Sequence, residues 1–233
     1  MTNFASVSPL KILEKSSPEG LGRGNLGVLI ARAGVGKTAC LIHIALDRIF
    51  RSGKLVHVSL EEGPEKVTSY YNVIYHDVAE ALDIPNEDEY QALIDRNRMI
   101  LAYLNRSFDL ERLRANLNNL ADRLEFSPET LIVDGLDFEN TGIDQFKGLK
   151  KIAEDFSLEI WFSALSHRHI KDVNERGIPY PVNSVDEIFS IIFHLHPEPS
   201  GLFLKVLKDH DKILDGGRSV RLDPNTILPL DEP

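Results

Sequence analysis

The sequence predicts an α/β protein built on a mainly parallel, twisted sheet with helices on its flanks. Apolar runs of strand length alternate with longer segments of helical periodicity, which is the pattern of parallel strands joined by crossover helices. Polar or acidic residues directly follow several of these runs, as expected where parallel strands end at one edge of a sheet. With 233 residues, 42% of them hydrophobic, the chain is long enough for one core, and we expect a single domain over 1–233.

The first apolar run, Leu26 to Ile30, follows the turn-forming entry GLGRGN and precedes a helix that extends to about residue 50. Residues 1–20 lie ahead of it and form an N-terminal extension. The second run, Leu55 to Leu60, ends in two acidic residues, and the third, Met99 to Leu104, has charged flanks. These runs predict the first three strands of the sheet.

Leucines at 110, 113, 117, 120 and 124 recur every three or four residues. This spacing predicts one apolar stripe on a helix that Asp109 can cap, packed on the sheet or serving a subunit interface. Later strands are predicted at 130–133, 158–165, 188–195 and 202–207. The polar stretch 168–184 contains Gly177, Pro179 and Pro181, which predicts a long mobile loop.

The formal net charge of −10 and the sequence pI of about 5.3 oppose general attraction to nucleic acid or to anionic membranes. We found neither an apolar run long enough to span a bilayer nor a signal-peptide pattern, so we expect no membrane partner and a cytoplasmic location. The single cysteine, Cys40, lies among apolar residues, where a small buried side chain is expected.

The segment ARAGVGKT, from Ala31 to Thr38, follows an apolar run and opens a helix, which is the context of a phosphate-binding loop. Its glycines let backbone N–H groups turn onto phosphate oxygens at a helix N-terminus. We expect Lys37 to reach the β and γ phosphates and the Thr38 hydroxyl to bind Mg²⁺. The residues predicted to contact the nucleotide here are Ala33, Gly34, Val35, Gly36, Lys37, Thr38 and Ala39.

Asp134 ends the apolar run LIVDG, where a carboxylate can hold Mg²⁺ directly or through water. An aspartate at a strand end is more often a turn residue, and only the upstream phosphate loop makes the metal role expected. Asp137 is a second acid nearby, for which we expect a solvated or capping role.

Glu61 and Glu62 follow the second apolar run, at the edge of the sheet where ligands bind. Hydrolysis requires a group that orients and activates water, and we expect one of these two glutamates to be the general base. The residues alone do not decide between them.

Ser166 and His167 follow another predicted strand at the same edge and could sense the γ phosphate. The pairs His167/His169 and His194/His196 have the spacing that places side chains on one face of a strand. Since no third or fourth ligand at suitable spacing accompanies either pair, we do not expect a zinc site.

These residues together resemble RecA-like ATPases, in the branch that includes KaiC and the DnaB-type helicase domain. The entry GLGRGNLGVLIARAGVGKT is similar to the family's first strand and phosphate loop, HVSLEEGPEKV to its strand with tandem catalytic glutamates, and ETLIVDGLD to the stretch that leads to its Mg²⁺-associated aspartate. FLKVLKDHDK is similar to the family's C-terminal β-hairpin, which offers a lysine and an arginine to the γ phosphate of a neighbouring subunit. Lys208 matches the lysine, whereas His210 stands where the arginine would be.

The resemblance implies a RecA-like P-loop NTPase core that binds nucleotide between subunits of a homo-oligomer, for which a hexameric ring is one arrangement. The expected function is Mg²⁺-dependent ATP binding and hydrolysis, with turnover that His210 could slow. One alternative is a regulatory module that binds nucleotide with little hydrolysis. A second is a DNA recombination or repair ATPase, in which the loop 168–184 would contact DNA although acidic residues offset its cations.

Overall fold

Strands and helices alternate along the chain in the computed structural model, which describes residues 8–13, 16–104, 108–167, 170 and 172–230. The strands are β1 (Leu26–Arg32), β2 (Leu55–Ser59), β3 (Arg98–Ala102), β4 (Thr130–Asp134), β5 (Glu159–Ser166), β6 (Ile191–Glu198), β7 (Gly201–Asp209) and β8 (Lys212–Leu222). The helices are α1 (Lys37–Phe50), α2 (Pro64–Ala81), α3 (Glu87–Asn97), α4 (Leu110–Leu124) and α5 (Ile143–Asp155), with short 3₁₀ helices η2 (Pro9–Leu13) and η3 (Asp186–Ile188).

The described strands form one 8-stranded mixed sheet in the order β3-β2-β4-β5-β1-β6-β7-β8. The strands from β3 to β6 in this order are parallel to their neighbours, whereas β7 pairs antiparallel with both β6 and β8. The predictions of an α/β fold, a mainly parallel sheet and a C-terminal β-hairpin are confirmed. Strand β5 lies between β1 and β4, so the ends of β1 and β4 are separated by one strand only.

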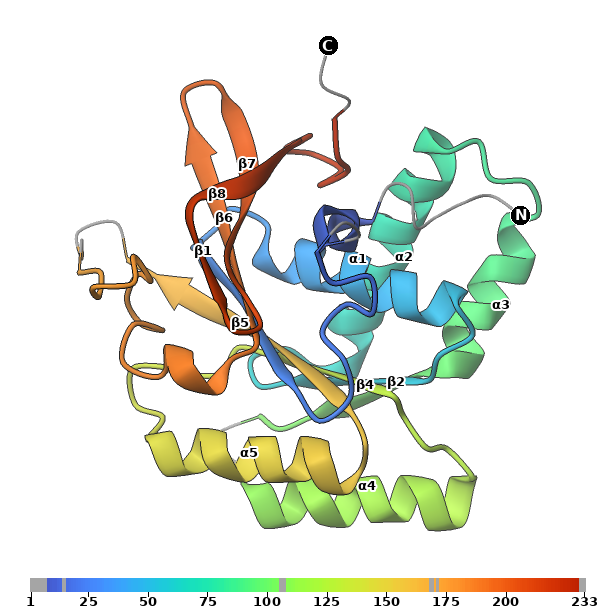
Figure 1. The fold of residues 1–233 in the computed structure, drawn as a ribbon. Coiled ribbons are helices and arrows are strands. Elements are labelled where there is room, and N and C mark those ends of the chain that lie inside the picture. Colours follow the sequence, from blue (N-terminus) through green and yellow to red (C-terminus); the bar gives the residue numbers. More distant parts are fainter. Residues whose placement is uncertain (1–7, 14–15, 105–107, 168–169, 171, 231–233) are drawn as a thin grey trace.

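Helices α1, α2 and α3 cover one face of the sheet, and α4 and α5 cover the other (Figure 1). Alternate residues of β1 enter the two cores: Leu29 and Ala31 pack on the α1 side, and Val28 and Ile30 on the α5 side. Because both faces are covered, β1 is buried from Leu26 to Ala31. This explains why β1 is a continuous apolar run in the sequence.

The predicted leucine stripe forms the inner face of α4. Leu113, Leu117 and Leu120 are buried, and the Asp109 carboxylate accepts a 2.8 Å hydrogen bond from the amide of residue 112, which caps the helix as expected. Leu124 is 60% exposed instead of buried, because it is the last helical residue before the chain turns away through a left-handed backbone conformation. The stripe is therefore one residue shorter than the sequence predicts.

The described part of the N-terminal extension packs on the domain. Leu10 and Leu13 of η2 are buried in the α1-side core. The Ser17 hydroxyl donates a 2.6 Å hydrogen bond to the carboxylate of Asp209 at the end of β7. This segment is thus attached both to the core and to the C-terminal hairpin.

The segment 168–184, which we expected to be a mobile loop, is anchored over its described part. Ile178 and Val182 are fully buried, and the Asn174 side-chain amide donates a 2.8 Å hydrogen bond to the Asn183 carbonyl. Residues 168, 169 and 171 lie outside the described residues. Burial of two aliphatic side chains, which the polar composition of the stretch conceals, holds residues 172–184 against the domain.

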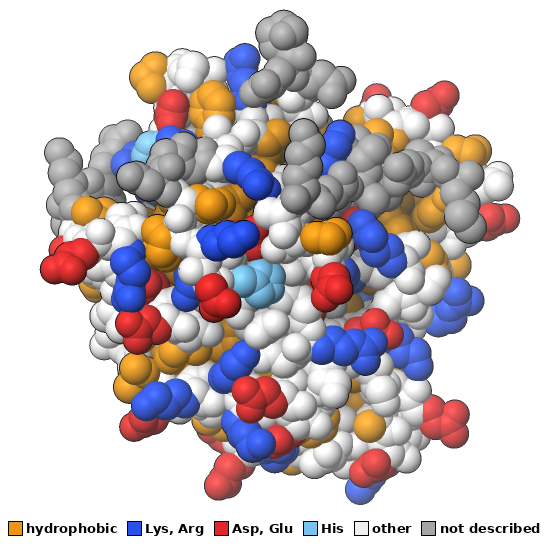
Figure 2. Space-filling model, in the orientation of Figure 1, with side chains coloured by type: hydrophobic (Ala, Val, Ile, Leu, Met, Phe, Trp, Pro, Cys, Tyr) orange, Lys and Arg blue, Asp and Glu red, His pale blue; other side chains and the backbone are white. Residues whose placement is uncertain are grey.

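Charged side chains of both signs are interspersed over the face shown in Figure 2, and neither sign forms a continuous patch there. Among the helices of the described residues, none is both long enough and apolar enough to cross a membrane.

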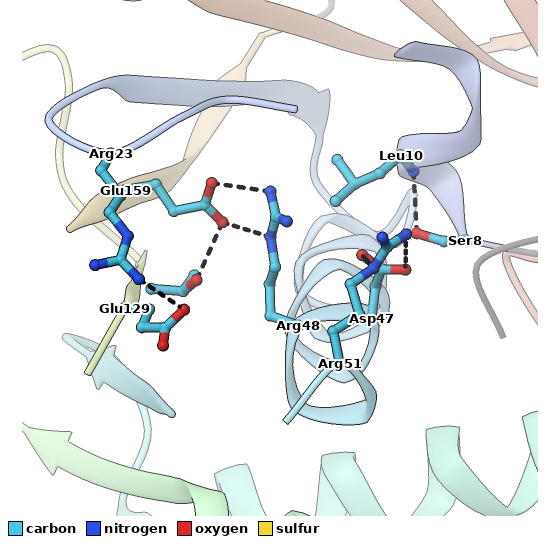
Figure 3. A network of polar contacts seen from close by, with 9 residues as sticks. Ser8, Leu10, Arg23, Asp47, Arg48, Arg51, Glu129 and Glu159 are labelled. Carbon is cyan, nitrogen blue, oxygen red and sulfur yellow. Dashed lines mark hydrogen bonds and ion pairs between the residues drawn. The ribbon is translucent and has the colours of Figure 1, made fainter. Parts of the chain in front are cut away.

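An ion pair joins the C-terminal half of α1 to the sheet (Figure 3). Arg48 binds the Glu159 carboxylate with two hydrogen bonds, of 2.7 and 2.9 Å, and the Thr130 hydroxyl donates a third, of 3.0 Å. Burial raises the pKa of Glu159, although Arg48 and Thr130 act in the opposite direction. The helix that begins at the phosphate loop is therefore fixed to both β4 and β5 at its other end.

Candidate functional site

The phosphate loop connects β1 to α1 at the carboxyl edge of the sheet. Gly36 has φ of 106°, in the left-handed region that favours glycine, and the helix starts at the next residue. The first helical hydrogen bond is donated by the amide of Cys40 to the Gly36 carbonyl, at 2.9 Å. The amides of residues 37–39 precede it and have no intrahelical acceptor, which is the arrangement that binds anions at a helix N-terminus.

A pocket of about 530 Å³ opens beside this loop at the ends of β4 and β5. Residues predicted from the sequence line part of its wall: Ala33, Gly34, Lys37, Thr38, Glu61, Asp134 and His167. Asp137, for which we expected a solvated or capping role, also lines the pocket. The other lining residues were not predicted as site residues: Gly135, Leu136, Phe138, Glu139, Ser163, Leu165 and Pro181. The fold therefore brings the phosphate loop, one of the two glutamates and the predicted metal ligand into a single pocket.

Thr38 and Asp134 are in direct contact in this pocket. The Thr38 hydroxyl donates a 2.7 Å hydrogen bond to Oδ2 of Asp134, and Ser163 donates a 2.5 Å hydrogen bond to Oδ1. Ser163 Oγ also accepts a 3.1 Å hydrogen bond from the amide of Gly135. Ser163 stands on β5, the strand between β1 and β4, and so it fixes the carboxylate from the intervening strand.

Lys37 is surrounded by acidic groups. Burial lowers the pKa of its ammonium group, whereas Asp134 and, to a smaller extent, Glu61 raise it. The site thus holds a partly desolvated cation next to two carboxylates, and an anionic ligand would further stabilise the charged form of this cation.

The two glutamates after β2 occupy different positions. Glu61 lines the main pocket and also a smaller cavity of about 160 Å³, in which Glu62, Ser59, Thr38 and Asp134 take part. Glu62 lines only the smaller cavity, and its amide donates a 3.0 Å hydrogen bond to the Ser59 hydroxyl. Glu61 is therefore the glutamate that reaches the same space as Lys37.

Gly135 allows Glu61 to take this position. A Cβ atom on Gly135 would lie 2.7 Å from Cγ of Glu61, closer than real Cβ atoms approach other atoms, and its φ is 86°. A glycine is needed here both for the backbone conformation and for the contact.

The end of β5 does not place Ser166 and His167 on the same side. His167 lines the pocket with Ser163 and Leu165, while Ser166 is absent from the lining and pairs in register with Arg32. Successive residues of a strand point to opposite faces, which is why Ser163 lines the pocket and Ser166, which we expected there, does not. The alternation along β5 could have indicated this from the sequence.

His167 lies against Glu139, with a distance of 2.9 Å between Nε2 and Oε1. Sequence reasoning missed Glu139, because it lies in a loop 28 residues before His167 and no motif marks it. Asp137, from the same loop, accepts hydrogen bonds from the amides of residues 139 and 140, which is the capping role expected for it.

Lys208 and His210 of the C-terminal hairpin do not line the pocket of their own chain. Lys208 Nζ donates a 2.9 Å hydrogen bond to the Asp186 carbonyl, and burial lowers the pKa of its ammonium group. His210 Nδ1 lies 2.9 Å from the Asp209 carboxylate. Both side chains therefore have partners within this protomer.

The donor set at the loop is a hydroxyl and a carboxylate, which are the oxygen ligands that Mg²⁺ prefers. Among the described residues, no group of three or more His, Cys, Asp or Glu side chains can hold a metal ion. His194 and His196 have rings 4.9 Å apart on β6, but no further ligand of the described chain joins them.

The sequence matches no known family model and no curated protein. The fold itself is α/β, with a mostly parallel mixed sheet flanked by helices, and it is compatible with the Rossmann and phosphate-loop classes of nucleotide-binding proteins.

Proposed function

We propose that this chain is a RecA-like P-loop ATPase of the KaiC and DnaB type, which binds ATP with Mg²⁺ and hydrolyses it. The observation that carries the proposal is the 2.7 Å hydrogen bond between Thr38 and Asp134. It joins the residue after the phosphate-loop lysine to the acidic end of β4, in the same pocket as Lys37 and Glu61. A chance glycine turn followed by an exposed lysine would not be expected to place the next residue in contact with this aspartate.

The two oxygens fit a magnesium site. Adjacent ligands of an octahedral Mg²⁺ ion with bonds of about 2.1 Å lie roughly 3 Å apart. Thr38 Oγ1 and Asp134 Oδ2 lie 2.7 Å apart, so a small shift lets both face one ion. When bound, the ion would neutralise charge on the β and γ phosphate oxygens. Ser163 would keep the carboxylate oriented by its hydrogen bond to Oδ1.

Protein groups bind the phosphates, stabilise the developing charge and activate water. The amides of residues 37–39 bind phosphate oxygens, and Lys37 stabilises negative charge as it develops during phosphoryl transfer. Glu61 accepts a proton from the attacking water, because it is the glutamate that lines the pocket shared with Lys37. Glu62, in the smaller cavity only, has a supporting role.

The test measures ATP binding and phosphate release on the same preparations. We expect Lys37→Ala to lose nucleotide binding, and Glu61→Gln to keep binding but lose phosphate release. Glu62→Gln, the matched control with the same chemistry one residue away, should retain most turnover. Wild-type protein that binds no nucleotide in the presence of Mg²⁺ would overturn the proposal, and normal turnover by Glu61→Gln would remove Glu61 as the base.

A regulatory module with little hydrolysis is the second candidate, and the contacts of the hairpin favour it. Lys208 and His210, the positions from which the family resemblance would supply cations to a neighbouring subunit, are both engaged within their own protomer. We propose a homo-oligomer in either case. Phosphate release measured on protein of known oligomeric state separates the two functions, since robust turnover in the assembled form dismisses the regulatory module.

The DNA recombination or repair role has no comparable support in the described residues. Arg176 of the anchored loop forms ion pairs with Asp186 and Glu187, at 2.8 and 2.9 Å. Its charge is therefore neutralised within the chain.

A further inference from the structure

The chain folds back after β8 in a tight turn, residues 223–228, which we call the C-terminal turn. The Asp223 carboxylate accepts hydrogen bonds from the amides of Asn225 and Thr226, at 2.8 and 3.0 Å. The Asp223 carbonyl accepts a 2.8 Å bond from the Ile227 amide, and the Asp223 amide donates a 2.9 Å bond to the Leu228 carbonyl. One aspartate thus organises the whole turn.

Ile227 has a backbone conformation that is unusual for its residue type. Its φ is 59°, in the left-handed region, where a β-branched side chain is an outlier. The side chain is only 2% exposed. Such a conformation persists only when the surrounding packing holds it, and such residues gather at functional sites.

The side chain that is held in this way rests on the phosphate loop. The position of a Cβ on Gly36 is 3.0 Å from Cδ1 of Ile227 and 4.0 Å from the Leu195 side chain. Gly36 is the residue whose left-handed conformation turns the chain into α1. Ile227 therefore lies directly behind the point where the loop becomes the helix.

A second contact attaches the C-terminal turn to the same helix. His43 Nε2, on α1, lies 2.7 Å from the Thr226 carbonyl. Burial lowers the pKa of His43 to about 4, so the imidazole is neutral near pH 7 and its Nε2–H donates to this carbonyl. The C-terminal turn is thereby held against α1 at Thr226, the residue before Ile227.

We infer that the C-terminal turn holds the phosphate loop in its phosphate-binding conformation, with Ile227 as the positioning residue. A Cβ on Gly34 would meet no atom within 4 Å, whereas the three atoms nearest a Cβ on Gly36 belong to Ile227 and Leu195, so these two side chains are the ones that support the loop at this point. Since β8 runs directly into the turn, the support also links the C-terminal hairpin to the nucleotide site. The inference rests on the proposed function and deepens it.

The first experiment compares the affinity for ATP with Mg²⁺ in Ile227→Val, Ile227→Ala and wild-type protein. Ile227→Val removes the Cδ1 methyl that lies against Gly36 and keeps the β-branched shape. We expect a graded loss of affinity, reaching about tenfold for Ile227→Ala, the size typical of residues that position a site without touching its ligand. Leu204→Ala is the control, because Leu204 is equally buried in the α1-side core but is not among the atoms nearest Gly36.

A second measurement distinguishes positioning from general stability. If the C-terminal turn supports the loop, nucleotide must in return stabilise the turn. Hydrogen exchange at the Ile227 amide of the wild-type protein should then slow when ATP and Mg²⁺ are added, while Ile227→Ala should lose this protection. A structural role alone would lower the melting temperature of the variant without a nucleotide-dependent change in exchange.

Any of three outcomes would overturn the inference. The first is an unchanged affinity for ATP in Ile227→Val and Ile227→Ala, and the second is an equal loss of affinity in Leu204→Ala. The third is a rate of hydrogen exchange at the Ile227 amide that does not change when nucleotide is added. Each presupposes that wild-type protein binds ATP. Failure of the wild-type protein to bind would instead overturn the proposed function.

Discussion

Thr38 and Asp134 are separated by 96 residues, and their side chains are joined by a 2.7 Å hydrogen bond at the edge of the sheet. The contact is possible because β5 alone separates β1 from β4, and Ser163 of β5 holds the other carboxylate oxygen. A hydroxyl, a carboxylate and a positioning serine from three elements form one site, and the predictions below test its parts.

Asp134→Asn should weaken the Mg²⁺ dependence of ATP binding and hydrolysis. The amide keeps the shape of the side chain but loses the charge that would hold the ion, so we expect a metal affinity about 10 to 100 times lower. Titration of phosphate release with Mg²⁺ measures this. Asp144→Asn is the control, since its side chain is 95% exposed on α5 and lies 3.7 Å from Lys147, and an equal shift in that variant would contradict the assignment.

Gly135→Ala should reduce turnover by displacing Glu61, whose Cγ lies 2.7 Å from the position of the new methyl group. Gly177→Ala is matched to it, because φ is 75° at Gly177 and 86° at Gly135, while no atom lies within 4 Å of a Cβ at Gly177. Both variants place an alanine at a positive φ, but only in Gly135→Ala does the new methyl group contact Glu61. Phosphate release should therefore fall in Gly135→Ala far more than in Gly177→Ala, and equal losses would refute the contact mechanism.

Lys37→Met should abolish nucleotide binding and leave the nucleotide-free protein at least as stable as the wild type. Burial lowers the pKa of Lys37, which means that the fold disfavours its charged form. A methionine of similar length removes this penalty and keeps the apolar contacts. Thermal unfolding without nucleotide checks stability, and calorimetry checks binding. A strongly destabilised variant would show that Lys37 supports the fold itself.

Arg48→Met should destabilise the protein by about 3–5 kcal/mol near neutral pH, because it leaves a buried carboxylate without its partner. The exposed pair Arg23 and Glu129 is the control, and Arg23→Met should change stability by less than about 1 kcal/mol (Figure 3). Urea unfolding measures both.

The pH dependence of the Arg48→Met variant follows from Glu159. Burial raises the pKa of Glu159 in the fold above its ordinary value of 4.5. A raised carboxyl pKa means that the folded state binds the proton more tightly, so stability falls as the pH rises from the unfolded value through the folded one. Without Arg48 the folded pKa rises further, and the destabilisation should be smaller at pH 5 than at pH 7.5. A loss that is independent of pH would contradict this account.

Local patterns in the sequence were sufficient for much of the fold. The structure confirms a strand at Leu26 to Ile30, a left-handed backbone at Gly36 and a helix capped by Asp109. Each of these features depends on residues that are near neighbours in the sequence. In the stretch 168–184, by contrast, the polar composition conceals two aliphatic residues, Ile178 and Val182, that are buried in the structure.

The sequence by itself determined the α/β class, the position of the predicted phosphate loop and the set of candidate acids, because each of these depends on residues that are adjacent or regularly spaced. Only the tertiary structure decided which of Glu61 and Glu62 reaches the pocket of Lys37 and which serine of β5 holds Asp134. It also placed Ile227 behind Gly36, 191 positions away along the chain. These contacts depend on strand order and on the register of parallel neighbours. Both are set by long-range packing and cannot be read from a local sequence pattern.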